Sequence, residues 1–318
     1  MQKTIFILFI LATFSLKAQE YKIGFYNVEN LFDTINDPTK DDEEFLPDGK
    51  NSWTGDRYME KINHINQVLN EMGNVLALGM CEIENANVVR DVIRFSPKMA
   101  KSHGVVHFQS PDERGIDVGL IYDSLKLKLV QSGSIRFTLP GKEKPSSRDI
   151  LWAKFKTKKD TIHILVNHWP SRRGGEQESE ANRMEAAKYA KNYIDSVLAI
   201  CPNAKIIFMG DLNDHPSNNA PKLIAERLNP QITKTSGEFG GSYFYDGAWD
   251  ILDHILTSKG LNSKKGFRIL PNSGKIYSPA YLLQEYKGAT QPFRTYGGKK
   301  YLGGYSDHLP VSITVRLR

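Results

Sequence analysis

Short apolar runs separated by polar turn segments make up most of the chain, and this is the pattern of strands in a mixed α/β protein. The runs predict strands at residues 75–80, 105–108, 117–122, 151–155, 161–167, 205–209, 251–256 and 311–317. Apolar residues at helical spacing predict helices over residues 57–72 and 177–199 and a short helix near 221–228. Several strands are adjacent pairs and do not alternate strictly with helices, so periodicity alone leaves several mixed α/β folds open.

The first residues have the layout of a secretory signal peptide. Lys3 gives a basic start, residues 5–16 are mostly apolar, and a small residue follows at Ala18. We therefore predict a leader over residues 1–19, cleaved after Ala18 or Gln19, and a secreted or periplasmic protein. The alternative is an uncleaved membrane anchor, but the apolar run is short for a membrane span. Stable membrane association is not expected.

Composition and charge limit the kinds of protein and of ligand that the sequence is compatible with. The chain has 318 residues, of which 40% are hydrophobic and 25% charged, an ordinary globular composition. Removing Lys3 and Lys17 with the leader lowers the formal net charge from +6 to +4. This mild excess of positive charge suits a polyanionic substrate without requiring one. Two cysteines, Cys81 and Cys201, exclude a four-cysteine zinc site, and we expect two buried, unpaired thiols in preference to a disulfide.

Polar residues follow or precede the apolar runs at several points. Gly210-Asp211-Leu212-Asn213 directly follows one predicted strand, and Ser306-Asp307-His308 lies just before the last one. Side chains at strand ends commonly form sites, and Asp, Asn and His serve metal-assisted attack on phosphorus. The candidate residues extend from position 27 to position 308, so both ends of the chain must meet at one site. We therefore expect a single domain over residues 20–318.

Taken together, these motifs form an ordered set. Its members are Asn27-Val28-Glu29-Asn30, Cys81-Glu82-Ile83-Glu84-Asn85, Asp117-Val118-Gly119, Asn167-His168-Trp169-Pro170, Gly210-Asp211-Leu212-Asn213, Asp250-Ile251-Leu252-Asp253-His254 and Ser306-Asp307-His308. The set resembles the endonuclease/exonuclease/phosphatase superfamily, which includes pancreatic deoxyribonuclease, abasic-site endonucleases, inositol polyphosphate phosphatases and sphingomyelinases. The resemblance spans roughly residues 21–316 and implies a four-layer α-β-β-α sandwich, with two packed sheets and helices outside.

The resemblance also implies a metal site. Glu82 matches the metal-binding Glu of the superfamily and is preferred to its neighbour Glu84, Asn27 matches the Asn beside that metal, and Asp307 would bind metal or position its neighbour. Hard oxygen ligands favour Mg²⁺, with Mn²⁺ or Ca²⁺ as alternatives.

Two histidines are expected to face the scissile phosphate. The resemblance gives His168 the partner Asp117 and gives His308 the partner Asp253. A carboxylate on one ring nitrogen fixes the tautomer and raises the basicity of the other. Asp211 would orient or deprotonate the attacking water and Asn213 would hold a phosphate oxygen; the choice between Asp211 and His308 as general base stays open.

The loops should determine the substrate. Arg148, Arg172 and Arg173 are candidate phosphate ligands, and residues 287–305 mix basic and aromatic side chains. We expect a metal-dependent phosphoesterase, with a nuclease favoured, that acts on nucleic acid as a monomer. The alternatives are a phosphomonoesterase or phospholipid phosphodiesterase, similar to inositol phosphate phosphatases or sphingomyelinases, and a catalytically inactive polyanion-binding protein. No long apolar loop suits membrane insertion, which counts against a sphingomyelinase.

Overall fold

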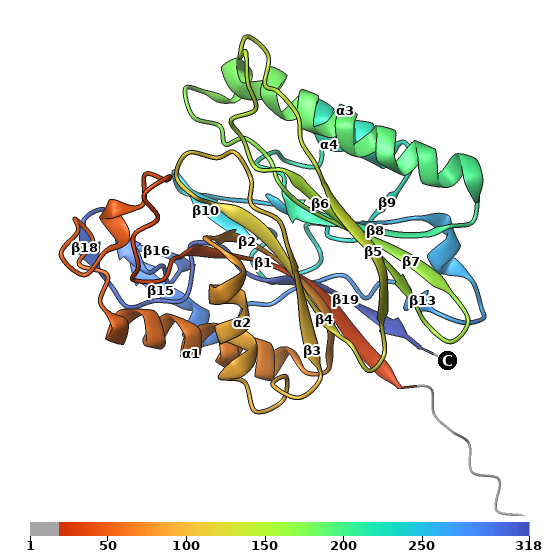
Figure 1. Ribbon diagram of the computed structural model, residues 1–318, viewed down its shortest axis with the longest axis horizontal. Coiled ribbons are helices and arrows are strands. Elements are labelled where there is room, and N and C mark those ends of the chain that lie inside the picture. The colour runs from red at the N-terminus through yellow and green to blue at the C-terminus, as the bar shows by residue number, and fades with distance from the viewer. Residues whose placement is uncertain (1–18, 318) are drawn as a thin grey trace, which may run out of the picture.

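The computed structural model describes residues 19–317 (Figure 1). All but the last residue of the predicted signal peptide lie outside this range. Within it, no helix combines the length and the apolar character needed to cross a bilayer.

Two large sheets form the centre of the molecule. The first has the strand order β13-β19-β1-β2-β4-β3, with β14 also paired to β19. Its strands are β1 (Glu20–Leu31), β2 (Val75–Ile83), β3 (His103–His107), β4 (Asp117–Asp123), β13 (Arg268–Ile269), β14 (Lys275–Ile276) and β19 (Val311–Arg316). Strands β1 and β2 are parallel, so their carboxyl ends lie at the same edge.

The second sheet has the order β5-β6-β7-β8-β12-β9. Its strands are β5 (Lys128–Ile135), β6 (Ile150–Lys156), β7 (Thr161–His168), β8 (Lys205–Asp211), β9 (Asn229–Pro230) and β12 (Asp253–Thr257). The central pair β7 and β8 is again parallel, and His168 is opposite Asp211 in its register.

Helices cover the outer face of each sheet (Figure 1). Helices α1 (Gly55–Met72) and α2 (Ala86–Arg94) lie on the first sheet, and α3 (Glu176–Ile200) and α4 (Asn219–Ala225) lie on the second. The main apolar core joins the inner faces of the two sheets, and a second core joins the second sheet to α3 and α4. The chain therefore has the predicted four-layer α-β-β-α arrangement.

The two sheets approach each other closely at Gly79 on β2. A Cβ atom at this position would lie 2.6 Å from Sδ of Met209 on β8, so a larger residue would force the sheets apart. This contact helps to bring the ends of strands from different sheets within reach of one another.

Local sequence explains why the helices begin where they do. The Thr54 side chain accepts a hydrogen bond from the Arg57 N–H at the start of α1. Asn85 caps α2 in the same way, by accepting from the N–H groups of Asn87 and Val88. Caps of this kind satisfy donors that have no partner within the helix.

Several elements were not predicted. They are α2, β5, the two-residue strands β9, β13 and β14, the hairpins β10 (Tyr243–Tyr245)–β11 (Ala248–Asp250), β15 (Leu283–Tyr286)–β16 (Ala289–Pro292) and β17 (Tyr296–Gly297)–β18 (Lys300–Tyr301), and the 3-10 turns η1 (Glu43–Phe45), η2 (Lys259–Asn262) and η3 (Ala280–Leu282). Both cysteines are free and Cys81 is buried, but Cys201 is exposed at the end of α3, so the prediction of two buried thiols is wrong for Cys201.

Candidate active site

The carboxyl ends of strands from both sheets surround one cavity of about 730 Å³. Its wall contains Glu82, Arg148, His168, Arg172, Arg173, Asp211, Asn213, Asp307 and His308. Asn27 and Asp253 lie behind this wall and bond to residues in it. The structure thus brings together all but one of the predicted site residues, and the exception is Asp117.

The backbone at these strand ends is unusual. Glu29, Asn30, Glu82 and Asn213 all have positive φ angles, between 50° and 58°. Such conformations are costly for residues other than glycine, and they concentrate at functional sites. At Glu82 the ladder to β4 shifts register between Cys81 and Ile83, so Glu82 is an extra residue that the bulge directs into the cavity.

Asn27 joins the two sheets at the base of the cavity. Its amide nitrogen donates to Oε1 of Glu82 at 3.2 Å and to Oδ2 of Asp211 at 3.1 Å. Its oxygen accepts the Glu29 N–H, which also fixes the orientation of the amide. The Asn27 amide therefore holds the carboxylates of Glu82 and Asp211 from opposite sheets in one place.

Carboxylates are crowded at this point. Burial, together with the negative charge of Asp307, raises the pKa of Glu82 to about 7. Burial also raises the pKa of Asp211 to about 6, although the imidazole of His308 opposes the shift. Oδ1 of Asp307 is buried and has no hydrogen-bond partner among the described residues. A divalent cation would satisfy these oxygens, so Glu82 and Asp307 fit the oxygen-ligand set that Mg²⁺ prefers.

Two other groupings of potential ligands are less suitable for a metal. Asp211, Asp253 and His308 offer atoms within 4.8 Å of one another, as do Cys81, His168 and Asp211. In the first group, however, Nδ1 of His308 already bonds to Asp253. In the second, burial raises the pKa of the Cys81 thiol well above its usual value, so the thiolate ligand is disfavoured.

His308 forms the predicted contact with Asp253. Its Nδ1 lies 2.7 Å from Oδ2 of Asp253, which also accepts the Ser242 hydroxyl at 2.6 Å. Its Nε2 lies 3.8 Å from Oδ2 of Asp211. Burial would lower the pKa of His308, but the carboxylates of Asp253 and Asp211 outweigh this effect and raise that pKa well above its usual value.

His168 lacks the predicted carboxylate partner. Asp117 instead bonds to Nε2 of His107 at 2.9 Å and accepts the Ser110 N–H at 2.9 Å, because it faces the loop between β3 and β4. The pairing of Asp117 with His168 is therefore wrong. Nε2 of His168 lies 3.8 Å from Oδ2 of Asp211, and burial together with the charges of Arg148 and Arg114 lowers the pKa of His168 well below its usual value.

The residues predicted to bind phosphate differ in how many hydrogen bonds they form with the rest of the protein. Arg148 is buried and donates to the carbonyls of His168 and Trp169 and to Asp112, so its bonds hold the turn after β7. Arg172 donates to the Asn213 carbonyl and to Asp250. The Asn213 amide donates to the Trp169 carbonyl at 3.1 Å. Arg173 lines the cavity beside them.

Several residues of the site were missed, among them Arg114 and Tyr243, whereas Arg294 lies in the loop 287–305 that was expected to contact the substrate. Arg114 reaches the cavity from the loop before β4, where Asp112 holds it through two bonds of 3.1 and 3.0 Å. The Tyr243 ring lies 4.7 Å from the His308 ring, and Arg294 donates to Oδ2 of Asp307 at 3.0 Å. An Asp–x–Arg sequence before a predicted strand was the available signal for Arg114.

The sequence matches the model of the endonuclease/exonuclease/phosphatase family over residues 22–317. The chain belongs to this family. Members of the family are hydrolases of phosphoester bonds. Among curated proteins, none matches the sequence.

Solved structures of this family have the same fold. An endonuclease/exonuclease/phosphatase family protein from Bacteroides thetaiotaomicron is 15% identical, with a TM-score of 0.62, over 95% of this chain and 99% of that one. A mannosyl-6-phosphatase from Bacteroides thetaiotaomicron VPI-5482 is 14% identical, with a TM-score of 0.60, over 93% and 99% of the two chains. The human nocturnin catalytic domain with bound sulfate is 16% identical, with a TM-score of 0.59, over 94% and 95%.

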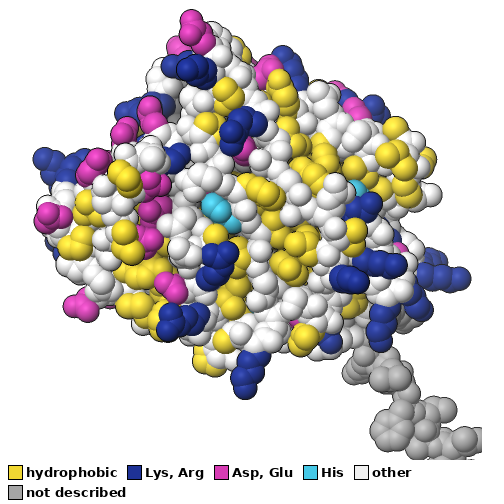
Figure 2. Space-filling view, in the orientation of Figure 1, with side chains coloured by type: hydrophobic (Ala, Val, Ile, Leu, Met, Phe, Trp, Pro, Cys, Tyr) yellow, Lys and Arg dark blue, Asp and Glu magenta, His cyan; other side chains and the backbone are white. Residues whose placement is uncertain are grey.

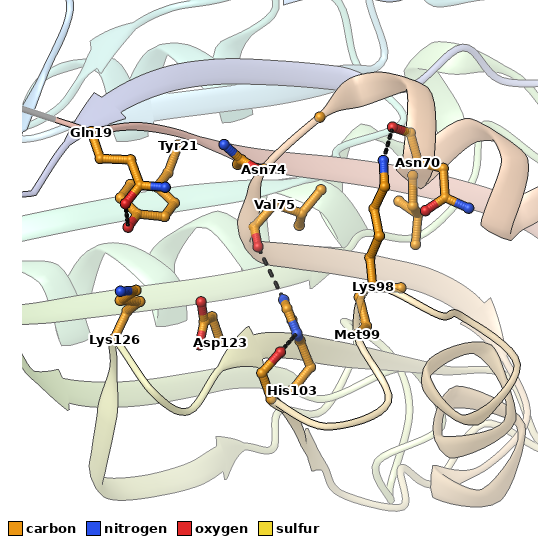
Figure 3. A pocket seen from close by; sticks show the side chains of 13 residues that line it. Gln19, Tyr21, Asn70, Asn74, Val75, Lys98, Met99, His103, Asp123 and Lys126 are labelled. Carbon is orange, nitrogen blue, oxygen red and sulfur yellow. Dashed lines mark hydrogen bonds between the residues drawn. The ribbon is translucent and has the colours of Figure 1, made fainter.

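A smaller cavity of about 180 Å³ lies at the opposite end of the first sheet (Figure 3). Its polar groups bond to one another: Nε2 of His103 contacts the Val75 carbonyl, Lys98 donates to the Asn70 carbonyl, and Tyr21 donates to Gln19. These contacts occupy part of its polar lining, and none of its lining residues belongs to the candidate active site.

Proposed function

We propose that the protein is an exported phosphoesterase that hydrolyses phosphodiester bonds in nucleic acid by in-line attack of water. The observation that carries the proposal is the position of Asp211. Its Oδ2 lies 3.8 Å from Nε2 of both His168 and His308, at the meeting point of the two sheets. A carboxylate between two imidazoles can accept a proton from water while the imidazoles contact the phosphate oxygens.

The other residues of the cavity support these roles. Asp253 and Ser242 fix the ring of His308 so that Nε2 faces the cavity. Asn27 holds the Asp211 carboxylate through its amide nitrogen. Glu82 and Asp307 would hold a divalent cation, with Mg²⁺ favoured, which supplies positive charge near the phosphate when it is bound.

A nucleic-acid substrate is supported by the side chains around this centre. Arg114, Arg172 and Arg173 line the cavity together with Tyr243 and Tyr245. Tyr245 is 70% exposed and its ring lies parallel to that of Tyr243, so it is available to stack on a base. Cationic and aromatic side chains beside a phosphate site are the usual means of binding a single strand. The leader pattern supports export, and we propose that the enzyme acts as a monomer.

A sugar phosphate is the second candidate substrate, because one of the similar structures is a mannosyl-6-phosphatase. Hydrolysis of a phosphomonoester would use the same histidines and carboxylates. The choice between the two substrates therefore depends on what the cavity walls bind.

The test is a substrate panel with the mature protein, residues 20–318. Single-stranded DNA, RNA, mannose 6-phosphate, inositol phosphates and sphingomyelin are incubated with Mg²⁺ and, separately, with EDTA. We expect Mg²⁺-dependent cleavage of nucleic acid that His308→Ala abolishes and that His215→Ala, a control outside the cavity, retains. Hydrolysis of the monoesters without cleavage of DNA or RNA would contradict the proposal.

A further inference from the structure

A second cavity of about 690 Å³ adjoins the active site. Arg114 lines both cavities. Asn30, whose N–H donates to Oε2 of Glu82 at 3.2 Å, and Arg294, which donates to Asp307, both line the second cavity. The second cavity therefore lies next to the Glu82–Asp307 carboxylate pair, through residues that bond to each of these acids.

Aromatic side chains form one wall of the second cavity. Phe45 stacks on Phe32 with ring centroids 4.2 Å apart and an interplanar angle of 4°. Tyr296 lies 6.2 Å from the buried Trp53, and its hydroxyl donates to the Asn51 carbonyl. Phe45 and Tyr296 are only partly buried, so each is packed on one side and lines the cavity.

The polar lining of the second cavity has both signs of charge. Two of its acids are already paired, since Glu44 contacts Lys50 and Glu29 contacts Arg294. Asp41 and Lys299 line the cavity and form no ion pair among residues 19–317. Figure 2 shows acidic and basic side chains close together on the left of the molecule, where β18 and the segment before α1 lie in Figure 1.

This combination selects a class of ligand. The aromatic side chains of this cavity can stack on the face of a ligand's ring. The carboxylates of its lining can accept hydrogen bonds from hydroxyl or amino groups of the ligand. Acids would repel a bare polyphosphate, whereas a single phosphate next to the ring could contact Arg114 or Lys299. A nucleoside joined to phosphate has all of these features.

We propose that the second cavity is a nucleoside subsite on the far side of the scissile phosphate from Tyr243 and Tyr245. We refer to it as the distal subsite. The inference deepens the proposed function and rests on it: the substrate is a phosphodiester whose chain continues on both sides of the phosphorus. A sugar phosphate monoester has a single ester group and would leave one cavity empty.

The experiment compares a tetranucleotide with methyl 4-nitrophenyl phosphate, a diester without nucleosides. Phe45→Ala and Lys299→Ala should lower kcat/KM for the tetranucleotide about 10-fold, mainly through KM, because a stacked base or a phosphate contact is lost. Activity on the small diester should stay within about 2-fold. Lys300→Ala is the matched control, because Lys300 is also exposed but does not line the cavity.

Equal losses on both substrates, or no loss on the tetranucleotide, would overturn the subsite. Binding of a fluorescent tetranucleotide is then measured in EDTA, where no metal-dependent cleavage occurs. This measurement tests the subsite independently of the proposed function. If Lys299→Ala weakens binding and Lys300→Ala does not, the subsite stands even where the wild type cleaves no nucleic acid. If both variants bind as the wild type does, the subsite is wrong, whatever the enzyme hydrolyses.

Discussion

Nδ1 of His308 lies 2.7 Å from Oδ2 of Asp253, and this bond joins the loop before β19 in the first sheet to the start of β12 in the second. The Ser242 hydroxyl occupies the same carboxylate oxygen at 2.6 Å. The Asp253 carboxylate therefore fixes the orientation of the imidazole through Nδ1, and Nε2 points towards Asp211.

Asp253→Asn should lower kcat by roughly 100-fold or more, because the amide cannot hold the imidazole in the same tautomer. The side chains are nearly isosteric, so the melting temperature should change by only a few degrees. Ser242→Ala keeps the carboxylate and should cost much less turnover. Steady-state kinetics with thermal unfolding of each variant checks this, and near wild-type turnover in Asp253→Asn would refute the assigned pairing.

The two aspartates proposed to assist histidines should behave differently. Asp117 bonds to His107 and Ser110 and not to His168, so Asp117→Asn should reduce the free energy of unfolding by about 1–3 kcal/mol and alter kcat only a few-fold. His168→Ala should remove most of the activity. Urea unfolding and kinetics of both variants provide the measurement. A loss of turnover in Asp117→Asn as large as that in His168→Ala would require a contact that the structure lacks.

The buried His254 should lower the stability of the folded protein as the pH becomes acidic. Burial lowers its pKa from 6.5 to about 4, while Nε2 contacts the Asp214 carbonyl at 2.8 Å. The unfolded chain then binds one more proton between these values, so stability is complete above pH 6.5 and falls as the pH drops towards 4. The loss is about 3 kcal/mol at most. Urea unfolding at pH 7 and pH 4.5 should show a smaller drop for His254→Gln, and an equal drop would exclude this group as the cause.

Glu82, a proposed metal ligand, should destabilise the protein when no metal is bound. Glu82→Gln removes one charge from the cluster with Asp211 and Asp307, so the melting temperature in EDTA should rise by about 2–4 °C. Added Mg²⁺ should raise the melting temperature of the wild type but not that of the variant. Thermal unfolding with and without Mg²⁺ measures both effects. A variant that Mg²⁺ stabilises as strongly as the wild type would place the metal elsewhere.

Elements with a strong local pattern were predicted well from the sequence. Helix α3 was expected at residues 177–199 and spans Glu176–Ile200, and β8 was expected at 205–209 and spans Lys205–Asp211. Strand β5 was missed because most of its residues are polar or exposed, and local patterns carry little information about such edge strands. Helix α2 has its four buried residues at helical spacing after the capping Asn85, so its local signal was present and was overlooked.

The site was predictable in its residue types but not in all its pairings. His308 and Asp253 meet as expected, whereas Asp117 turns towards the loop between β3 and β4 and bonds to His107. The conformation of that loop decides the outcome, and it also places Arg114 in the cavity. Neither result follows from spacing, because both depend on contacts with Asp112 and Ser110 that form only in the folded chain.

The amide of Asn27 links Glu82 in one sheet to Asp211 in the other. Neither sheet contains a complete set of reacting groups, so hydrolysis can begin only after the two halves have docked. Activity therefore reports whether the two sheets have docked. If the enzyme is an exported nuclease, as we propose, a precursor kept unfolded before export would not cleave the nucleic acid of the cell that makes it.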